Sequence, residues 1–343
     1  MKGDDHSTRD AMSEALAELL NADSPSQFAP WVLGRPLASL CARLGLPQPE
    51  VIAGNLVVGN LDTAQFVLCA HLDEASFSVT RAENGTAWLT PLHRFDETSS
   101  PNLRLVGVRN GAAWTGPVAR LTEGPRGRYC AFGGDVRLGD RAVYYAKAES
   151  YGTTLAGKAV DDRTGAVISL FAAVELLSLG IKLAVVLSDG EQNAPDGYFS
   201  RTFPNILSRL DADAIIVFID GIFEDGLRRA GLTGPQAGAL VVPHTGDGRG
   251  YCVPPLLFAR LRDIIVPGAR AKGIDVQVTS AYHSRGDDWG MVTNPVFGVE
   301  RSAIFVSFGG WGSTPERRTV DTRGLDQCRM FTVAAAQALA ASG

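Results

Sequence analysis

The sequence predicts an α/β protein that carries a small all-β domain inserted within it. Apolar strand-forming runs alternate with helical segments near both ends of the 343-residue chain, a pattern typical of βαβ units. From residue 80 to residue 149, short strands and turns rich in glycine and proline replace this pattern, and no helical period is found. We therefore expect residues 1–79 and 150–343 to form one α/β domain, with residues 80–149 as a β-rich, barrel-like insert.

The first part of the α/β domain shows two helices followed by two strands. Apolar residues recur at helical spacing over 9–21 and again over 36–45, where Gly45 provides a stop. Two apolar runs, 51–58 and 64–70, then have the composition of strands and are separated by a short turn. The insert follows with short strands bounded by turn residues, which we expect at 86–92, 103–111, 114–121, 129–134 and 141–148.

The βαβ texture returns after the insert. A helical period spans 165–179 and is closed by Gly180, which suits the left-handed backbone of a helix end. The remaining segments alternate between apolar runs and helical periods, and they predict strands at 181–189, 214–220 and 303–308, and helices near 206–210, within 254–271 and over 325–341.

Composition excludes several functional classes. The chain is 45% hydrophobic and 20% charged, and its net charge of −5 gives no general attraction to nucleic acid or anionic membranes. No apolar run approaches the roughly 20 residues of a membrane span, and the polar N-terminus lacks the apolar core of a secretory signal. The five cysteines are scattered and form no CxxC pair, so we expect reduced thiols in a cytoplasmic protein and no thiolate zinc site.

Polar side chains collect where apolar strands end. His71 and Asp73 follow a buried strand and are two residues apart, so in extended backbone they leave the same face. Asp161, Glu191 and Asp220 also follow hydrophobic runs, and the strand ends of α/β proteins are common positions for sites. One imidazole with several carboxylates is typical of a metal site with nitrogen and oxygen ligands.

These residues also have a purely structural interpretation. Asp161 and Asp162 precede a helix and could cap it, since aspartate is favoured at helix starts. Asp220 and Gly221 resemble a turn, and His71 could be a hydrogen-bonded interior histidine. The metal interpretation implies hydrolytic chemistry, because a carboxylate can bridge two cations that lower the pKa of a shared water, while a separate carboxylate removes its proton.

Two segments resemble motifs of a known family. Residues 71–79 (HLDEASFSV) resemble the HMDEIGF-type motif of the glutamyl-aminopeptidase family, the TET-type co-catalytic metallo-aminopeptidases, and 157–165 (GKAVDDRTG) resemble its KALDDR motif. The β-rich insert lies between the two motifs as in that family, and its segment 136–145 is similar to a VKVGD strand there. Weaker similarities at 54–59 (to an LGN segment) and 283–290 (to a GTDA region) follow the same order along the chain.

The resemblance implies a fold and an assembly. It implies a zinc-aminopeptidase-like three-layer α/β/α domain with a mixed sheet, with the insert as a dimerisation-type domain through which the chain forms a homo-oligomer. It implies that His71, Asp161 and Asp220 hold one divalent metal ion, that Asp161 bridges to a second ion held by Glu191, and that Asp73 orients His71. The metal is expected to be zinc, or alternatively cobalt or manganese, with one or two ions per chain.

The sequence departs from the family at two positions. The family has consecutive glutamates, the first a general base, where this chain has Gly190-Glu191, and its last metal ligand is a histidine where this chain has Gly312. Three replacements are conceivable: Asp189 as base, Glu191 as base in a one-metal site, or His283 as a ligand from another loop.

The function that follows is a metal-dependent hydrolase of an amide or a short peptide, aminopeptidase-like but with an altered metal centre. The alternatives are a repurposed one-metal enzyme that catalyses a non-peptidase reaction in a biosynthetic pathway, or a non-catalytic homologue. His283 and Trp311 are candidates for binding a small-molecule or peptide substrate, and the glycines at 309, 310 and 312 are expected to line the same cavity as Trp311.

Overall fold

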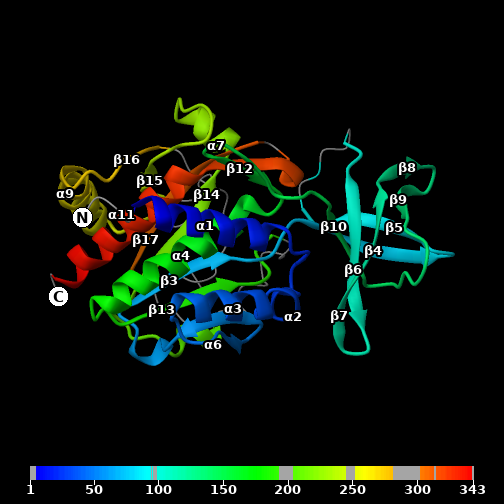
Figure 1. The fold of residues 1–343 in the computed structure, drawn as a ribbon, viewed down its shortest axis with the longest axis horizontal. Coiled ribbons are helices and arrows are strands. Elements are labelled where there is room, and N and C mark those ends of the chain that lie inside the picture. Colours follow the sequence, from blue (N-terminus) through cyan, green and yellow to red (C-terminus); the bar gives the residue numbers. More distant parts are fainter. Residues whose placement is uncertain are drawn as a thin grey trace.

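The structure is a computed structural model that describes residues 5–93, 95, 99–192, 204–244, 252–280, 302–312 and 314–341. Over these residues it contains a large mixed sheet with packed helices and, beside it, an antiparallel sheet (Figure 1). This arrangement confirms the predicted α/β fold with an all-β insert. None of the helices in the described ranges is both long enough and apolar enough to span a membrane.

The large sheet is assembled from segments on both sides of the insert. Its strands over the described residues are, in spatial order, β1 (Glu50–Ile52), β2 (Asn55–Gly59), β13 (Leu183–Ser188), β3 (Phe66–His71), β14 (Ile215–Ile222), β17 (Ala303–Trp311), β18 (Arg318–Asp321), β12 (Thr154–Gly157) and β11 (Glu149–Tyr151). In addition, β15 (Ala239–Val241) pairs with β17, and β16 (Val276–Val278) pairs with β15. The four strands β13, β3, β14 and β17 run parallel. Their carboxyl ends therefore meet at one edge.

The central strands are apolar because both faces of the sheet are covered. Every residue of β3 and of β13 is buried, as expected for parallel strands that are packed on two sides. The described helices are α1 (Asp5–Leu20), α2 (Ala29–Val32), α3 (Gly34–Leu44), α4 (Val160–Ser178), α6 (Pro204–Leu207), α7 (Glu224–Arg229), α8 (Pro255–Arg260), α9 (Val266–Ala271) and α11 (Thr322–Ala340), with short helical turns η1 (Leu61–Thr63), η2 (Leu261–Ile265) and η3 (Pro315–Arg317).

Helix α4 is the central helix of the fold. It packs against β3, β13 and β14 and against the helices α1 and α11, which lie beside it in Figure 1. Its sequence from Ala166 to Ala173 is buried throughout, because a helix enclosed on all sides carries apolar residues all round. Its first turn is irregular, with non-helical backbone at Asp161 and Asp162, and this irregular turn lies at the edge where the parallel strands end.

The second sheet is antiparallel and has its own core. Its strands run in the order β7 (Ala112–Arg120), β6 (Asn102–Arg109), β10 (Arg141–Tyr144), β4 (Ser76–Glu83), β5 (Thr86–Pro91), β9 (Gly127–Ala131) and β8 (Thr122–Gly124). It curls so that β7 also contacts β9, and it encloses a separate apolar cluster around Phe77, Leu105 and Cys130. The sheet begins at Ser76, before residue 80, and its last strand ends at Tyr144.

Candidate metal centre

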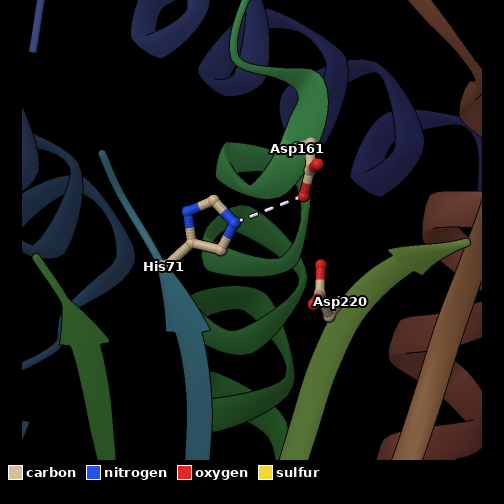
Figure 2. Close-up of side chains that lie close together, drawn as sticks. All are labelled: His71, Asp161 and Asp220. Atoms are coloured by element: carbon tan, nitrogen blue, oxygen red, sulfur yellow. Dashed lines mark hydrogen bonds and ion pairs between the residues drawn. The ribbon is translucent and has the colours of Figure 1, made fainter. Parts of the chain in front are cut away.

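Three side chains converge at the carboxyl edge of the parallel strands. His71 is the last residue of β3, Asp220 lies near the end of the neighbouring strand β14, and Asp161 lies in the irregular first turn of α4. Figure 2 shows the three side chains directed toward one another, and their candidate ligand atoms all lie within 4.8 Å of each other. The dashed line in Figure 2 joins His71 Nε2 to Asp161 Oδ1, which lie 3.2 Å apart.

Glu191 is the fourth side chain at this centre. It follows β13, which pairs in parallel with β3 in a register that places Ser188 beside His71. Its Oε2 lies 3.4 Å from His71 Nε2, and its side chain is only 9% exposed. The structure therefore brings together His71, Asp161, Asp220 and Glu191, which are separated by up to 149 positions along the chain (220 − 71).

Asp73 lies behind the imidazole and supports it. His71 Nδ1 lies 3.2 Å from the backbone oxygen of Asp73 and 3.5 Å from its Oδ1. The Asp73 carboxylate also accepts backbone N–H bonds from Glu191 (3.1 Å) and Gln192 (3.0 Å), and a short hydrogen bond from the Ser26 hydroxyl. One fully buried carboxylate thus orients both the histidine and the loop that carries Glu191.

The electrostatics of the centre favour a positive charge. Burial by itself would lower the pKa of His71, but the carboxylates of Glu191, Asp161 and Asp73 outweigh it and raise that pKa well above its usual value. Burial would likewise raise the pKa of Asp73, yet its bonds with His71 and Ser26 hold it below the usual value. One nitrogen and several oxygen donors in a negative environment fit a divalent cation such as zinc, cobalt or manganese.

Asp162 has a structural role, unlike its neighbour Asp161. Its Oδ1 accepts the backbone N–H of Gly165 at 2.9 Å, which caps the regular part of α4, and its Oδ2 accepts the backbone N–H of His71 at 3.3 Å. Burial and the nearby Asp220 carboxylate raise the pKa of Asp162 well above its usual value. The peptide bond between Asp161 and Asp162 is cis. Asp162 thus caps the helix, whereas the side chain of Asp161 is directed toward the centre.

Asp189, one of the candidate bases, is engaged elsewhere. Its two oxygens accept the backbone N–H groups of Gln27 (2.7 Å) and Ala29 (2.8 Å) at the start of α2. Burial and the neighbouring Asp73 raise the pKa of Asp189 well above its usual value. These contacts are those of a carboxylate that fixes the segment before α2, and within the described residues Asp189 forms no hydrogen bond or ion pair with His71.

Arg318, which the sequence analysis did not single out, contacts the centre directly. Its Nη1 donates a short, charge-assisted hydrogen bond to Asp161 Oδ2, and its guanidinium carbon lies 4.1 Å from the centroid of the Phe223 ring. Burial would raise the pKa of Asp161, but Arg318 and His71 hold it far below its usual value. The Arg318 side chain is 19% exposed. The only sequence signal was its place shortly after Gly312, the position of the expected ligand.

The glycines at 309, 310 and 312, which we expected to line one cavity with Trp311, each have a close neighbour where a side chain would begin; at Gly309 this neighbour is Cγ of Gln236, 2.4 Å from an added Cβ. At Gly310, an added Cβ would lie 2.4 Å from the Phe223 ring, which already fills that space. Gly312 has a φ of +114°, and a Cβ there would lie 2.8 Å from the backbone oxygen of Arg317. A side chain, an aromatic ring and backbone therefore already fill the space beside these three glycines.

Of the two residues expected to bind substrate, Trp311 and His283, only Trp311 lies within the described residues. Trp311 lies at the end of β17, partly buried, with the guanidinium carbon of Arg228 5.0 Å from its ring centroid. His283 lies outside the described residues. A cavity beside the centre has a different lining, which consists of Glu74, Ala75, Tyr144, Ala159, Asp161, Gln192, Pro315 and Arg318.

A buried cluster of charges supports the segment before α4. Lys158 is 2% exposed and forms ion pairs with Asp23 and with Glu74, whose Oε2 lies 3.1 Å from the lysine Nζ. Arg163, fully buried, pairs with Glu74 at 3.2 Å and donates to the backbone oxygen of Leu72 at 3.0 Å. Buried charges of opposite sign compensate one another here and tie α4 to the end of β3.

Comparison with solved structures shows the same fold in several peptidases. An aminopeptidase from Desulfurococcus kamchatkensis superposes with a TM-score of 0.74 at 18% identity over 95% of this chain and 94% of that one. A TET aminopeptidase from the archaeon Thaumarchaeota archaeon SCGC AB-539-E09 gives 0.76 at 15% identity over 95% of each chain. The TET1 peptidase of Pyrococcus horikoshii gives 0.72 at 14% identity over 95% of this chain and 99% of that one. No family model and no curated protein sequence matches the chain.

Proposed function

We propose that this protein is a metal-dependent hydrolase of an amide or a short peptide, with His71, Asp161 and Asp220 as ligands of a divalent metal ion. The observation that carries the proposal is the convergence of their ligand atoms within 4.8 Å at the carboxyl edge of the sheet. Three protein ligands that leave a position open for water are typical of catalytic zinc. The shared fold with aminopeptidases supports the same class of reaction.

The residues around the ligands have distinct tasks. A metal ion bound here would polarise a substrate carbonyl and lower the pKa of a bound water. Glu191 lies 3.4 Å from His71 Nε2, and both oxygens of Asp189 are already bonded to backbone, so Glu191 is the carboxylate placed to accept the proton of that water. Asp73 fixes the orientation of His71 and of the loop that carries Glu191.

The test separates a base from a ligand. The protein is loaded with zinc, cobalt or manganese and assayed against aminoacyl amides and short peptides, and Glu191→Gln is compared with the wild type. We expect hydrolysis to fall by about 10²–10⁴-fold, the usual cost of removing a general base, while the metal content stays the same. Glu83→Gln, at a half-exposed position of the second sheet, is the matched control.

Two outcomes would contradict this assignment. Loss of metal from the Glu191→Gln variant would make Glu191 a ligand instead of a base. A metal-loaded wild-type protein that hydrolyses none of these substrates would favour the second candidate, a non-peptidase reaction at one metal ion, for which the contact between Arg318 and Asp161 is the specific observation.

We also propose that the chain forms a homo-oligomer through residues 80–149, taken as an inserted domain. The support is the separate core of the antiparallel sheet and the fold shared with the Pyrococcus horikoshii peptidase, which is described as assembling into a tetrahedron or an octahedral shell.

A further inference from the structure

We propose that the guanidinium of Arg318 occupies the position of a second cation beside Asp161, so that the centre binds a single metal ion and Arg318 supplies the other positive charge. This inference rests on the proposed function, because it concerns the same carboxylates. It assigns Arg318 as a residue of the reaction centre, and it names the chemistry expected of it: stabilisation of negative charge on a substrate oxygen by a fixed guanidinium.

The two oxygens of Asp161 face different partners. Oδ1 lies 3.2 Å from His71 Nε2, on the side of the ligand cluster, whereas Oδ2 accepts the hydrogen bond from Arg318 Nη1. A carboxylate that bridges two cations presents one oxygen to each of them. In this chain the second oxygen is directed at the guanidinium cation of Arg318.

The packing holds Arg318 in this place. Its guanidinium lies against the face of Phe223, and the Phe223 ring in turn fits only because two glycines lie beneath it. An added Cβ would approach that ring to 2.5 Å at Gly221 and to 2.4 Å at Gly310. Arg318 also begins β18 and is paired with Gly157 of β12, just before the segment that carries Asp161. The position of Arg318 is therefore fixed by the pairing of β18 with β12 and by the ring of Phe223.

The backbone near Gly312 both disfavours a histidine ligand at that position and is followed by the strand that carries Arg318. At Gly312 the φ of +114° disfavours any side chain, and the backbone oxygen of Arg317 lies 2.8 Å from where a Cβ would stand. A histidine ligand is therefore not accommodated at this position. Arg318 follows Arg317 in the chain and donates its hydrogen bond to Asp161. A guanidinium and a divalent cation on the same carboxylate oxygen would repel each other, so the arginine excludes a second ion.

Arg318 also lines the cavity beside the centre. Asp161, Gln192 and Tyr144 form other parts of its wall. A substrate oxygen that enters this cavity meets a positive charge that is already oriented and needs no reorganisation when negative charge develops. This is the task that a second metal ion performs in a two-metal hydrolase.

The experiment is a zinc titration of the metal-free, full-length protein by calorimetry, with ion content checked by mass spectrometry. We expect one ion per wild-type chain. Arg318→Gln should bind its ion about tenfold more tightly, because a positive charge next to Asp161 is removed. Arg318→Lys, which keeps the charge, should stay within about threefold of the wild type. Arg317→Gln loses a charge one residue away on a 68% exposed side chain and is the matched control.

The outcomes distinguish this inference from the proposed function. Two ions in the wild-type protein, or weaker or unchanged zinc binding by Arg318→Gln, would overturn the inference and leave the hydrolase proposal standing. Absence of any bound zinc in the wild-type protein would overturn both. Circular dichroism of each variant confirms that it is folded, and if Arg318→Gln fails to fold, the number of zinc ions bound per wild-type chain still decides between one ion and two.

Discussion

His71 is the residue on which the candidate centre depends. Its imidazole is 2% exposed, and it is the one nitrogen donor in the cluster of His71, Asp161 and Asp220 that the described residues form. Its orientation is set from behind by Asp73 and its backbone by Asp162. Metal sites depend on such supporting contacts nearly as much as on the ligands themselves.

Replacement of this histidine should remove the metal. We expect His71→Ala to weaken zinc binding by more than about 100-fold, since loss of a direct ligand exceeds the 10–100-fold typical of a supporting residue. Equilibrium dialysis followed by elemental analysis measures the loss. His244→Ala, at a half-buried histidine outside the cluster, should retain zinc. Equal metal content in His71→Ala and wild type would refute the ligand assignment.

At this scale the sequence predicted the cluster but missed its partner. His71 and Asp220 follow apolar runs, and the rule that parallel strand ends meet was enough to bring them together. Arg318 could not be found in that way, because its place depends on the turn at Gly312 and on the ring of Phe223, which belong to segments far apart in sequence. Likewise, Asp189 looked available as a base only while its bonds to the start of α2 were unknown.

Among the elements, β14 and β17 determine which side chains pack beside the candidate metal centre. The sequence allowed a turn at Asp220-Gly221, but β14 continues to Ile222 because it pairs with β17 through Gly221 and Phe308. Glycines in these two strands accept the ring of Phe223, on which Arg318 lies. Glycine within a strand commonly marks such a close approach, so the signal was present although its partner was not identifiable.

Two glycine substitutions should therefore have opposite effects on stability. Gly310→Ala forces a Cβ to within 2.4 Å of the Phe223 ring, and we expect a loss of about 1–3 kcal/mol, typical of overpacking. Gly268→Ala in α9 meets nothing within 4 Å and should stabilise by about 0.5–1 kcal/mol. Urea unfolding of both variants measures this. A Gly310→Ala variant as stable as the wild type would show that the ring is free to move.

On the scale of the whole molecule, each of the two hydrophobic cores contains at least one buried cysteine. Cys41, Cys69 and Cys328 are buried in the α/β core and Cys130 in the core of the second sheet, while Cys252 is exposed. Burial raises the pKa of Cys41 to about 11 and that of Cys130 to about 12. The thiolate is the reactive form, so the thiols of Cys41 and Cys130 are both shielded from solvent and protonated at neutral pH.

One thiol of the five should thus react in the native protein. We expect an aromatic disulfide reagent at about pH 8 to modify one thiol per chain quickly and all of them in denaturant. The colour released in the two conditions gives the count, and Cys252→Ser should abolish the fast phase. Rapid modification of Cys130 would instead mean that the second sheet opens on its own.

The overall architecture followed from the sequence more readily than its boundaries did. The change from helical period to short strands near residue 80 predicted a separate sheet, and the return at 165–179 predicted the central helix α4. Composition does not show where strand pairing begins, and β4 already pairs with β10 at Ser76, before the change of composition near residue 80. The α4 segment also starts earlier than expected, at Val160, although its first turn is irregular.

The cavity beside Asp161 has a consequence for any attempt to shorten this protein. Its wall includes Tyr144, which ends β10 in the antiparallel sheet, together with Asp161 and Arg318 from the α/β body. A truncated form without residues 80–149 would lose Tyr144 and leave that flank open to water. The wall of this cavity is therefore formed jointly by two sheets that have separate cores.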